Sequence, residues 1–389
     1  MKLSLAAILP FFTLFPALLT TSCGDSTTGT GGNGGNSTTS STDGGSAGSP
    51  NGGSGGSGAS GGSTSSSGGT NTGGSTTGTG GSTTTSSTTT TTGTGGSVAV
   101  LDPSKDGPYQ VKTVDDSVTV GDHQVPIHCV YPVDGPTSGP YPVVVVGHGF
   151  QLPPSQYYKY LDRLATFGYV ALTADFPTSF FGPDNPANAA DMSAGLDWAE
   201  SKLPGIANAD LAGMTGHSLG GKVALLAATK DARVKASIVL DPVDGGGGPG
   251  GGCNPPGCVD VSALMPQLNI PTGFLGETTD AMGGFQPCAP AAENYTTFYA
   301  GANSPSFTVT IKGANHMSFL DDVASCGFTC NFCNMATLDN ATVNGMSRAY
   351  VVAFYERYLR NNAGYDTYLT GAEAQALYVQ TGIATIQSK

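Results

Sequence analysis

The stretch Leu211-Ala212-Gly213-Met214-Thr215-Gly216-His217-Ser218-Leu219-Gly220-Gly221-Lys222 decides the fold. An apolar segment, a serine flanked by glycines and the helix-forming residues 223–228 predict a strand, a tight turn and a helix. In such a GxSxG turn the serine takes a strained backbone conformation that exposes its hydroxyl. Gly216 and Gly220 are needed because a Cβ at either position would clash. The turn is therefore a candidate nucleophile elbow, with Ser218 as the nucleophile.

Residues 1–22 have the composition of a secretory signal. Lys2 precedes an apolar run over residues 3–19 that two prolines interrupt, so the run is too short and too broken for a spanning helix. Cys23 follows directly after small residues, as in a bacterial lipoprotein. We expect lipidation at Cys23 and a place in a bacterial cell envelope, with plain secretion as the alternative.

Residues 23–97 predict a disordered tether. After Cys23 the segment is almost wholly Gly, Ser, Thr and Asn, and it contains no aromatic residue. Such a chain cannot bury a core, and its flexible reach is about 50 Å. The sequence thus divides into a signal peptide (1–22), a tether (23–97) and a catalytic domain (98–389).

Residues 98–389 are long enough for one large α/β domain. Once Lys2, Asp25 and Asp43 are set aside, 26 acidic and 14 basic residues remain. This acidic balance argues against binding to nucleic acid or to lipid headgroups. Contact with a membrane is therefore expected only through the lipid anchor, and the sequence leaves the oligomeric state open.

Seven cysteines follow Cys23, and in an exported protein most should be paired, with the odd count leaving one free. They are Cys129, Cys253, Cys258, Cys288, Cys326, Cys330 and Cys333. The last three are spaced like a metal knuckle, but no fourth ligand stands nearby, so disulfides are favoured over zinc. We expect neither a metal nor a cofactor.

Apolar strands alternate with helices along the domain. The β-branched run 141–147 is typical of a strand buried on both faces of a parallel sheet. Further strands are expected at 126–131, 169–175, 236–241, 272–276 and 306–311, and helices at 155–166, 187–201 and 344–360. This order predicts a doubly wound and mostly parallel sheet with helices on both faces, and the nucleophile elbow makes it an expected α/β-hydrolase fold.

A serine hydroxyl needs a base, and in this architecture the chain order is serine, acid, histidine. Of the five histidines only His316 follows Ser218, in a loop after the last predicted strand. His316 is therefore the predicted base. The remaining histidines, interpreted as packing or turn residues, are His123, His128, His148 and His217.

The acid that orients His316 is not decided by chain order. Asp241, Asp244, Glu277 and Asp280 all lie between the serine and the histidine at plausible loop positions. The commonest position, after the seventh strand, favours Glu277 or Asp280, whereas Asp241 ends the sixth strand. Asp175 precedes the serine, so chain order argues against it. The oxyanion hole is expected from the backbone N–H groups of Leu219 and of Phe150 in the Gly149-Phe150 turn.

Several motifs together resemble the chlorophyllase family of α/β-hydrolases and, more distantly, bacterial cutinase-like polyester hydrolases. They occur in family order over about residues 120 to 360: Gly147-His148-Gly149, Gly216-His217-Ser218-Leu219-Gly220-Gly221-Lys222, Asp241-Pro242-Val243-Asp244-Gly245, Cys288-Ala289-Pro290, Asn294 with Phe298-Tyr299, and His316-Met317 before Leu320-Asp321-Asp322. The resemblance implies that the acid is Asp241, the first aspartate of its motif, in preference to Asp244, Glu277 or Asp280.

The sequence also departs from the family near the substrate. Leu219 stands where plant chlorophyllases usually carry arginine, and the Gly-rich loop 245–258, which a bridge between Cys253 and Cys258 would close, has no family counterpart. The reaction class therefore transfers better than the substrate.

The leading hypothesis is a serine carboxylic-ester hydrolase that uses Ser218, His316 and Asp241 through an acyl-enzyme, on a small-molecule or polymeric ester. One alternative is a polyester or lipid hydrolase with an open cleft. The other is a surface-tethered binding protein that keeps the fold without catalysis.

Overall fold

The computed structural model describes residues 100–179, 184–245, 256–282 and 287–389, all within one compact unit, Thr88–Lys389. The predicted signal peptide, Cys23, the tether and Cys253 lie outside the described residues. Among the helices that the structure describes, none is both long enough and apolar enough to cross a bilayer.

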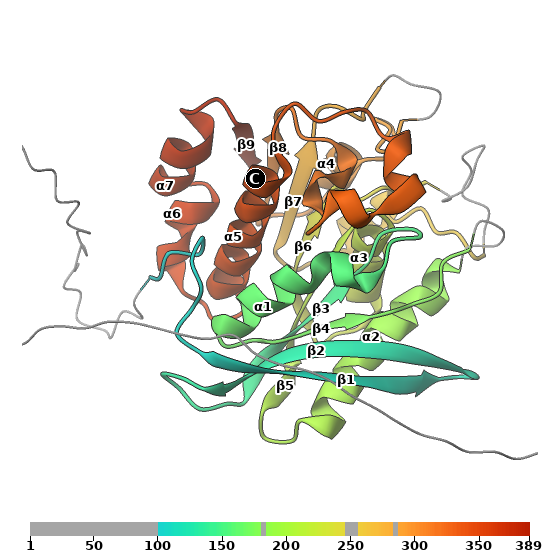
Figure 1. Ribbon diagram of the computed structural model, residues 1–389, viewed down its shortest axis with the longest axis vertical. Coiled ribbons are helices and arrows are strands. Elements are labelled where there is room, and N and C mark those ends of the chain that lie inside the picture. Colours follow the sequence, from blue (N-terminus) through green and yellow to red (C-terminus); the bar gives the residue numbers. More distant parts are fainter. Residues whose placement is uncertain (1–99, 180–183, 246–255, 283–286) are drawn as a thin grey trace, which may run out of the picture. The chain divides into compact units, whose positions relative to one another are not determined.

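A nine-stranded sheet forms the centre of the described domain, in the order β1-β2-β4-β3-β5-β6-β7-β8-β9 (Figure 1). The neighbours from β4 through β8 pair in parallel, while β1 with β2, β2 with β4 and β8 with β9 are antiparallel. The strands are β1 (Gln110–Val120), β2 (His123–Asp134), β3 (Tyr141–Gly147), β4 (Val170–Ala174), β5 (Ala207–His217), β6 (Val234–Leu240), β7 (Thr272–Glu277), β8 (Ser306–Ile311) and β9 (Ala384–Ser388).

Helices cover both faces of this sheet, and alternation along β3 shows why. Val143 and Val145 lie in one apolar cluster with buried side chains of α2 and α3, whereas Val144 and Val146 lie in a second cluster with those of α1 and α5. Successive strand side chains point to opposite faces, so a continuous apolar run requires cover on both. The helices are α1 (Tyr158–Thr166), α2 (Asn185–Lys202), α3 (Leu219–Lys230), α4 (Tyr295–Gly301), α5 (Asn340–Tyr358), α6 (Asp366–Leu369) and α7 (Ala372–Ala374).

The observed elements occupy the predicted positions, with small differences at their ends. Strands β3 and β8 have the predicted bounds, and α5 covers 340–358 where 344–360 was expected. Two short helices, α6 and α7, and the antiparallel edge strand β9 follow α5. The described architecture is mixed α/β with a mostly parallel sheet, consistent with an α/β-hydrolase fold.

Candidate active site

Ser218 lies between β5 and α3 in a backbone conformation that L-residues rarely adopt, with φ 56° and ψ −123°. Its N–H donates to the Leu240 carbonyl at 3.0 Å, which fixes the turn to the end of β6. A Cβ added to Gly216 would overlap the backbone of Gly220, and one added to Gly220 would overlap the backbone of Gly147. The two glycines are therefore required by close backbone contact, as the sequence predicts.

Three predicted site residues meet at the carboxyl ends of the strands. His316 Nε2 lies 2.8 Å from Ser218 Oγ, and His316 Nδ1 lies 2.6 Å from Asp241 Oδ2. His316 and Asp241 are buried, whereas Ser218 is partly exposed and so can be reached from solvent. This arrangement can move a proton from the hydroxyl to the imidazole while a carboxylate holds the opposite ring nitrogen.

Asp241 is held in an uncommon backbone conformation directly after β6. Its φ is 43°, and its N–H donates to the Leu275 carbonyl at 2.6 Å. Burial raises the pKa of Asp241, and the hydrogen bond and charge of His316 act in the opposite direction. The turn therefore aims the carboxylate at the imidazole and away from solvent.

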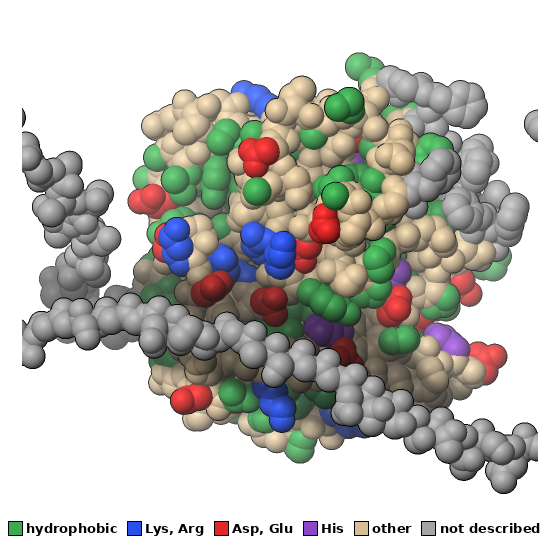
Figure 2. Space-filling model, viewed as in Figure 1, with side chains coloured by type: hydrophobic (Ala, Val, Ile, Leu, Met, Phe, Trp, Pro, Cys, Tyr) green, Lys and Arg blue, Asp and Glu red, His purple; other side chains and the backbone are tan. Residues whose placement is uncertain are grey.

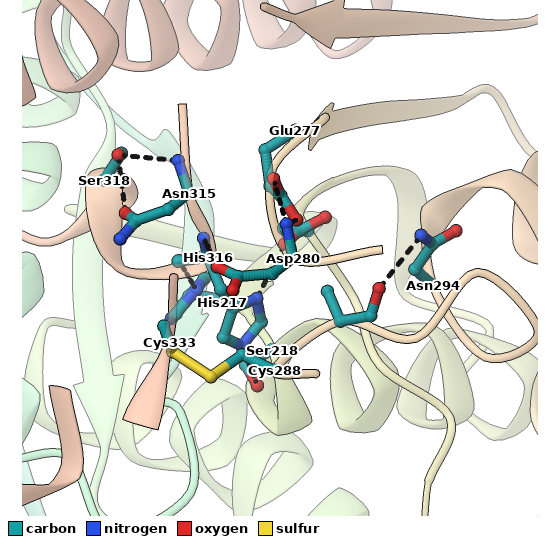
Figure 3. A network of polar contacts seen from close by, with 12 residues as sticks. His217, Ser218, Glu277, Asp280, Cys288, Asn294, Asn315, His316, Ser318 and Cys333 are labelled. Carbon is teal, nitrogen blue, oxygen red and sulfur yellow. Dashed lines mark hydrogen bonds and ion pairs between the residues drawn. A yellow bond between two sulfur atoms is a disulfide. The ribbon is translucent and has the colours of Figure 1, made fainter. Parts of the chain in front are cut away.

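The two other acids considered at the seventh strand are also buried beside His316 (Figure 3). Asp280 Oδ2 accepts the backbone N–H of His316 at 2.8 Å, and its Oδ1 accepts that of Asn334 at 2.7 Å. Glu277 accepts the N–H groups of Thr279 and Asp280. Glu277 therefore binds the backbone of its own loop after β7, and Asp280 binds the backbone of His316, while Asp241 contacts the His316 ring.

Asp244 serves a different contact. Its Oδ1 lies 3.3 Å from Nζ of the fully buried Lys222, whose Nζ also donates to the Asp244 carbonyl at 2.8 Å. The two carboxylate oxygens accept the N–H groups of Val261 and Ser262. Asp244 thus ties the last residue of the elbow motif to the far end of the Gly-rich loop.

The residues expected to form the oxyanion hole lie where the sequence predicts turns. Leu219 opens α3 directly after the serine, and Phe150 follows the end of β3. The N–H of Gly149, one residue earlier, donates to the hydroxyl of Tyr157 at 3.1 Å. The buried Tyr157 side chain therefore holds the backbone next to Phe150 in place.

The other four histidines make ordinary packing and polar contacts. His148 is buried, and its Nε2 lies 3.1 Å from the Phe176 carbonyl. His123 and His128 pair with Asp191 and Asp115. His217 is fully buried and hydrogen-bonded at both ring nitrogens.

Disulfides lie close to the same loops. Cys288 is joined to Cys333 and Cys326 to Cys330, Cys258 is disulfide-bonded, and Cys129 is a buried free thiol. Figure 3 shows the first of these bonds near Ser218 and His316. Within the described ranges, one group has the spacing of a metal site, Asp280 with Cys288 and Cys333, but these two sulfurs are bonded to each other and are not available as thiolates.

On the face shown in Figure 2, Lys and Arg side chains gather near the middle, with Asp and Glu side chains beside them. Arg163 pairs with Asp106 and Arg357 with Asp366 at 3.0 and 2.7 Å. Exposed pairs of this kind contribute little stability.

The family model for chlorophyllase matches residues 100–377, which is most of the chain. The chain belongs to the chlorophyllase family. Chlorophyllase-2 of Arabidopsis thaliana is 30% identical over 205 residues, which is 47% of this chain and 62% of the relative. A chlorophyllase-1 of Citrus unshiu is 28% identical over 247 residues, 58% of this chain and 70% of the relative.

A bacterial relative carries a different name. The bis(hydroxyethyl) terephthalate hydrolase of Streptomyces coelicolor is 27% identical over 195 residues, 49% of this chain and 54% of the relative. The chain thus spans about six tenths or less of the Arabidopsis and Streptomyces relatives. Family membership and these names together support a hydrolase.

Sequence reasoning missed how the supporting residues of this family member are used. From sequence, Glu277 and Asp280 are only alternatives for the acid, and no polar contact is predicted for Tyr157 or Lys222. An acidic residue after a buried strand signals a polar contact, but not whether that contact is to a ring or to a backbone. Which atom each carboxylate contacts depends on the folded path of the loops, and the sequence does not give that path.

Proposed function

We propose that this chain is a serine carboxylic-ester hydrolase of α/β-hydrolase fold. The observation that carries the proposal is the continuous line of contacts from Ser218 Oγ through the His316 ring to the Asp241 carboxylate, at 2.8 and 2.6 Å. These distances are within hydrogen-bond reach of a nucleophile, its base and the group that orients the base. Kinship with proteins named as hydrolases supports the same class.

In the proposed reaction Ser218 Oγ attacks the ester carbonyl and gives its proton to His316 Nε2. Asp241 stabilises the imidazolium through Nδ1. The oxyanion accepts hydrogen bonds from the N–H groups of Leu219 and Phe150, and the N-terminus of α3 adds favourable partial charge. His316 then protonates the leaving alcohol, and water repeats the sequence to release the acid.

The test is turnover of a short p-nitrophenyl ester by the parent protein and by Ser218→Ala. We expect kcat/KM to fall by about 10⁴-fold or more, because the nucleophile is lost. Ser347→Ala is the control, since Ser347 is a buried serine in α5 that bonds the Val343 carbonyl. Retention of most activity in Ser218→Ala would contradict the proposal.

The bacterial relative supports a second candidate substrate, an aryl diester or polyester, because its printed name is that of a terephthalate ester hydrolase. Turnover that rises sharply on insoluble polyester, relative to a soluble ester, would favour this candidate. A catalytically silent binding protein would give no Ser218-dependent turnover on any ester.

We also propose that the protein is exported and anchored through a lipid on Cys23, with residues 23–97 as tether. A disulfide near the site, Cys288–Cys333, supports an oxidising compartment. A Cys23→Ser variant is expected to leave the membrane fraction, and continued membrane association would contradict the anchor.

A further inference from the structure

A buried chain of hydrogen bonds runs beneath the proposed catalytic residues. The Gly149 N–H donates to Tyr157 Oη at 3.1 Å, Tyr157 Oη lies 2.9 Å from His217 Nδ1, and His217 Nε2 lies 2.8 Å from the His316 carbonyl. Tyr157 and His217 are both fully buried. Figure 3 shows His217 beside His316, and the two ring centroids are 4.6 Å apart.

The direction of each bond in this chain follows from its end groups. A carbonyl can only accept, so His217 Nε2 is protonated and donates a hydrogen bond to the backbone carbonyl of His316. Burial and the neighbouring His316 lower the pKa of His217 well below its ordinary value, so the ring is neutral and Nδ1 is an acceptor. Tyr157 therefore donates to Nδ1 and accepts from Gly149, and every polar atom is satisfied in one tautomer.

The two ends of this series of hydrogen bonds lie at turns that carry expected catalytic groups. Gly149 directly precedes Phe150, an expected oxyanion donor, and the other end is the backbone of His316, the expected base. The space between them is tight, because a Cβ added to Gly149 would lie 3.2 Å from both His217 Nδ1 and Tyr157 Oη. These hydrogen bonds thus fix the spacing of two turns that are more than 150 residues apart in the sequence.

We propose that Tyr157 and His217 are positioning residues that hold the oxyanion turn and the base turn in register for ester hydrolysis. The inference rests on the proposed function. A shift of about 1 Å in reacting groups can cost about 10²-fold in rate, so loss of this connection should lower kcat more than it raises KM.

The first test uses Tyr157→Phe, which keeps the ring and removes the hydroxyl. Active sites are counted by fluorophosphonate titration, so that misfolded protein does not enter kcat. We expect kcat per titrated site to fall by about 10- to 100-fold with KM changed by less than about threefold. The matched control is Tyr365→Phe, which also removes a buried hydroxyl that accepts a backbone N–H, from Leu101 at 3.1 Å. The control is expected to keep kcat within about twofold of the parent value.

A second test compares two substitutions of His217. The amide of His217→Gln can still donate to the His316 carbonyl, whereas His217→Leu cannot, so the glutamine variant should retain more of kcat. In a double-mutant cycle, adding Tyr157→Phe to His217→Leu should reduce kcat by less than about threefold further, because the connection is already broken.

Unchanged kcat in Tyr157→Phe, an effect confined to KM, or full multiplication of the two losses would overturn the positioning role. If Tyr157→Phe does not fold, the glutamine and leucine variants of His217 decide, and equal kcat in these two would overturn it. Such results leave the proposed function intact as long as Ser218→Ala is inactive. An active Ser218→Ala would instead remove the proposed function itself.

Discussion

The nucleophile side and the acid side of the candidate site are built by different means. On the nucleophile side, Gly216 and Gly220 are in such close backbone contact that no side chain fits. On the acid side, Asp241, Glu277 and Asp280 are all buried around His316, and each accepts hydrogen bonds in this region. Close backbone contact allows only glycine at these two positions of the elbow. Around His316, by contrast, three buried carboxylates each accept a different hydrogen bond.

This difference has a functional consequence. Replacing a residue that is fixed by close packing introduces steric strain, so it should lower the stability of the fold more than it changes the chemistry. A buried carboxylate acts through its charge and its hydrogen bonds. Replacing it with the isosteric amide removes the charge and keeps one acceptor oxygen, so the two contributions can be separated. The comparison of the two sides is therefore open to direct test by substitution.

The largest effect is expected where a carboxylate contacts the imidazole ring. Asp241→Asn should lower kcat/KM on a soluble ester by about 10⁴-fold, because an amide can hold the wrong tautomer of His316. Asp280→Asn is the matched variant, since Asp280 contacts the His316 backbone and the amide oxygen can still accept that N–H. We expect it to lose about tenfold or less, and equal losses in the two variants would show that the acid has been misassigned.

A smaller free-energy effect, seen in stability, is expected on the nucleophile side. Gly220→Ala should lower the free energy of unfolding by about 3 kcal/mol or more, because the new methyl meets the Gly147 backbone. Gly345→Ala, in α5 with open space around it, should instead raise it by about 0.5–1 kcal/mol. Urea unfolding measures both, and a neutral Gly220→Ala would mean that the elbow is not sterically determined.

The smallest effect on activity is expected at Glu277, where the change appears in the pH dependence of stability. Burial, with the nearby Asp241 charge, raises the pKa of Glu277 from 4.5 to about 8. Between these values the folded state keeps a proton that the unfolded chain has released, so the parent loses stability as the pH rises through this window. Glu277→Gln carries no such proton and should gain Tm relative to the parent from pH 5 to pH 9, with kcat/KM within about tenfold. A constant difference in Tm would contradict the shifted pKa.

Much of the fold follows from sequence patterns because the signals are local. The β-branched run 141–147 and the glycine-flanked Ser218 each specify an element without reference to distant residues, and both occur as predicted. The sequence patterns do not predict the antiparallel strands β1 and β9; β1 is mostly exposed and carries no apolar run. Exposed edge strands depend on their pairing partners, which the sequence does not name.

For the candidate site, the sequence predicts the base more directly than the acid. His316 is fixed by chain order, as the histidine that follows Ser218. The choice among Asp241, Glu277 and Asp280 needs the turn geometry, because a one-residue change in loop path decides which oxygen reaches a ring and which reaches an N–H. Spacing alone leaves that choice open, and only the family resemblance favours Asp241.

Fluorophosphonate labelling followed by peptide mass spectrometry tests the central proposal most directly, because only an activated serine reacts at a useful rate. The proposed arrangement predicts a single adduct on the peptide that contains Ser218 in the parent protein, and labelling slowed by several orders of magnitude in His316→Ala. An unlabelled parent, an adduct on another serine, or equal labelling of His316→Ala would contradict it.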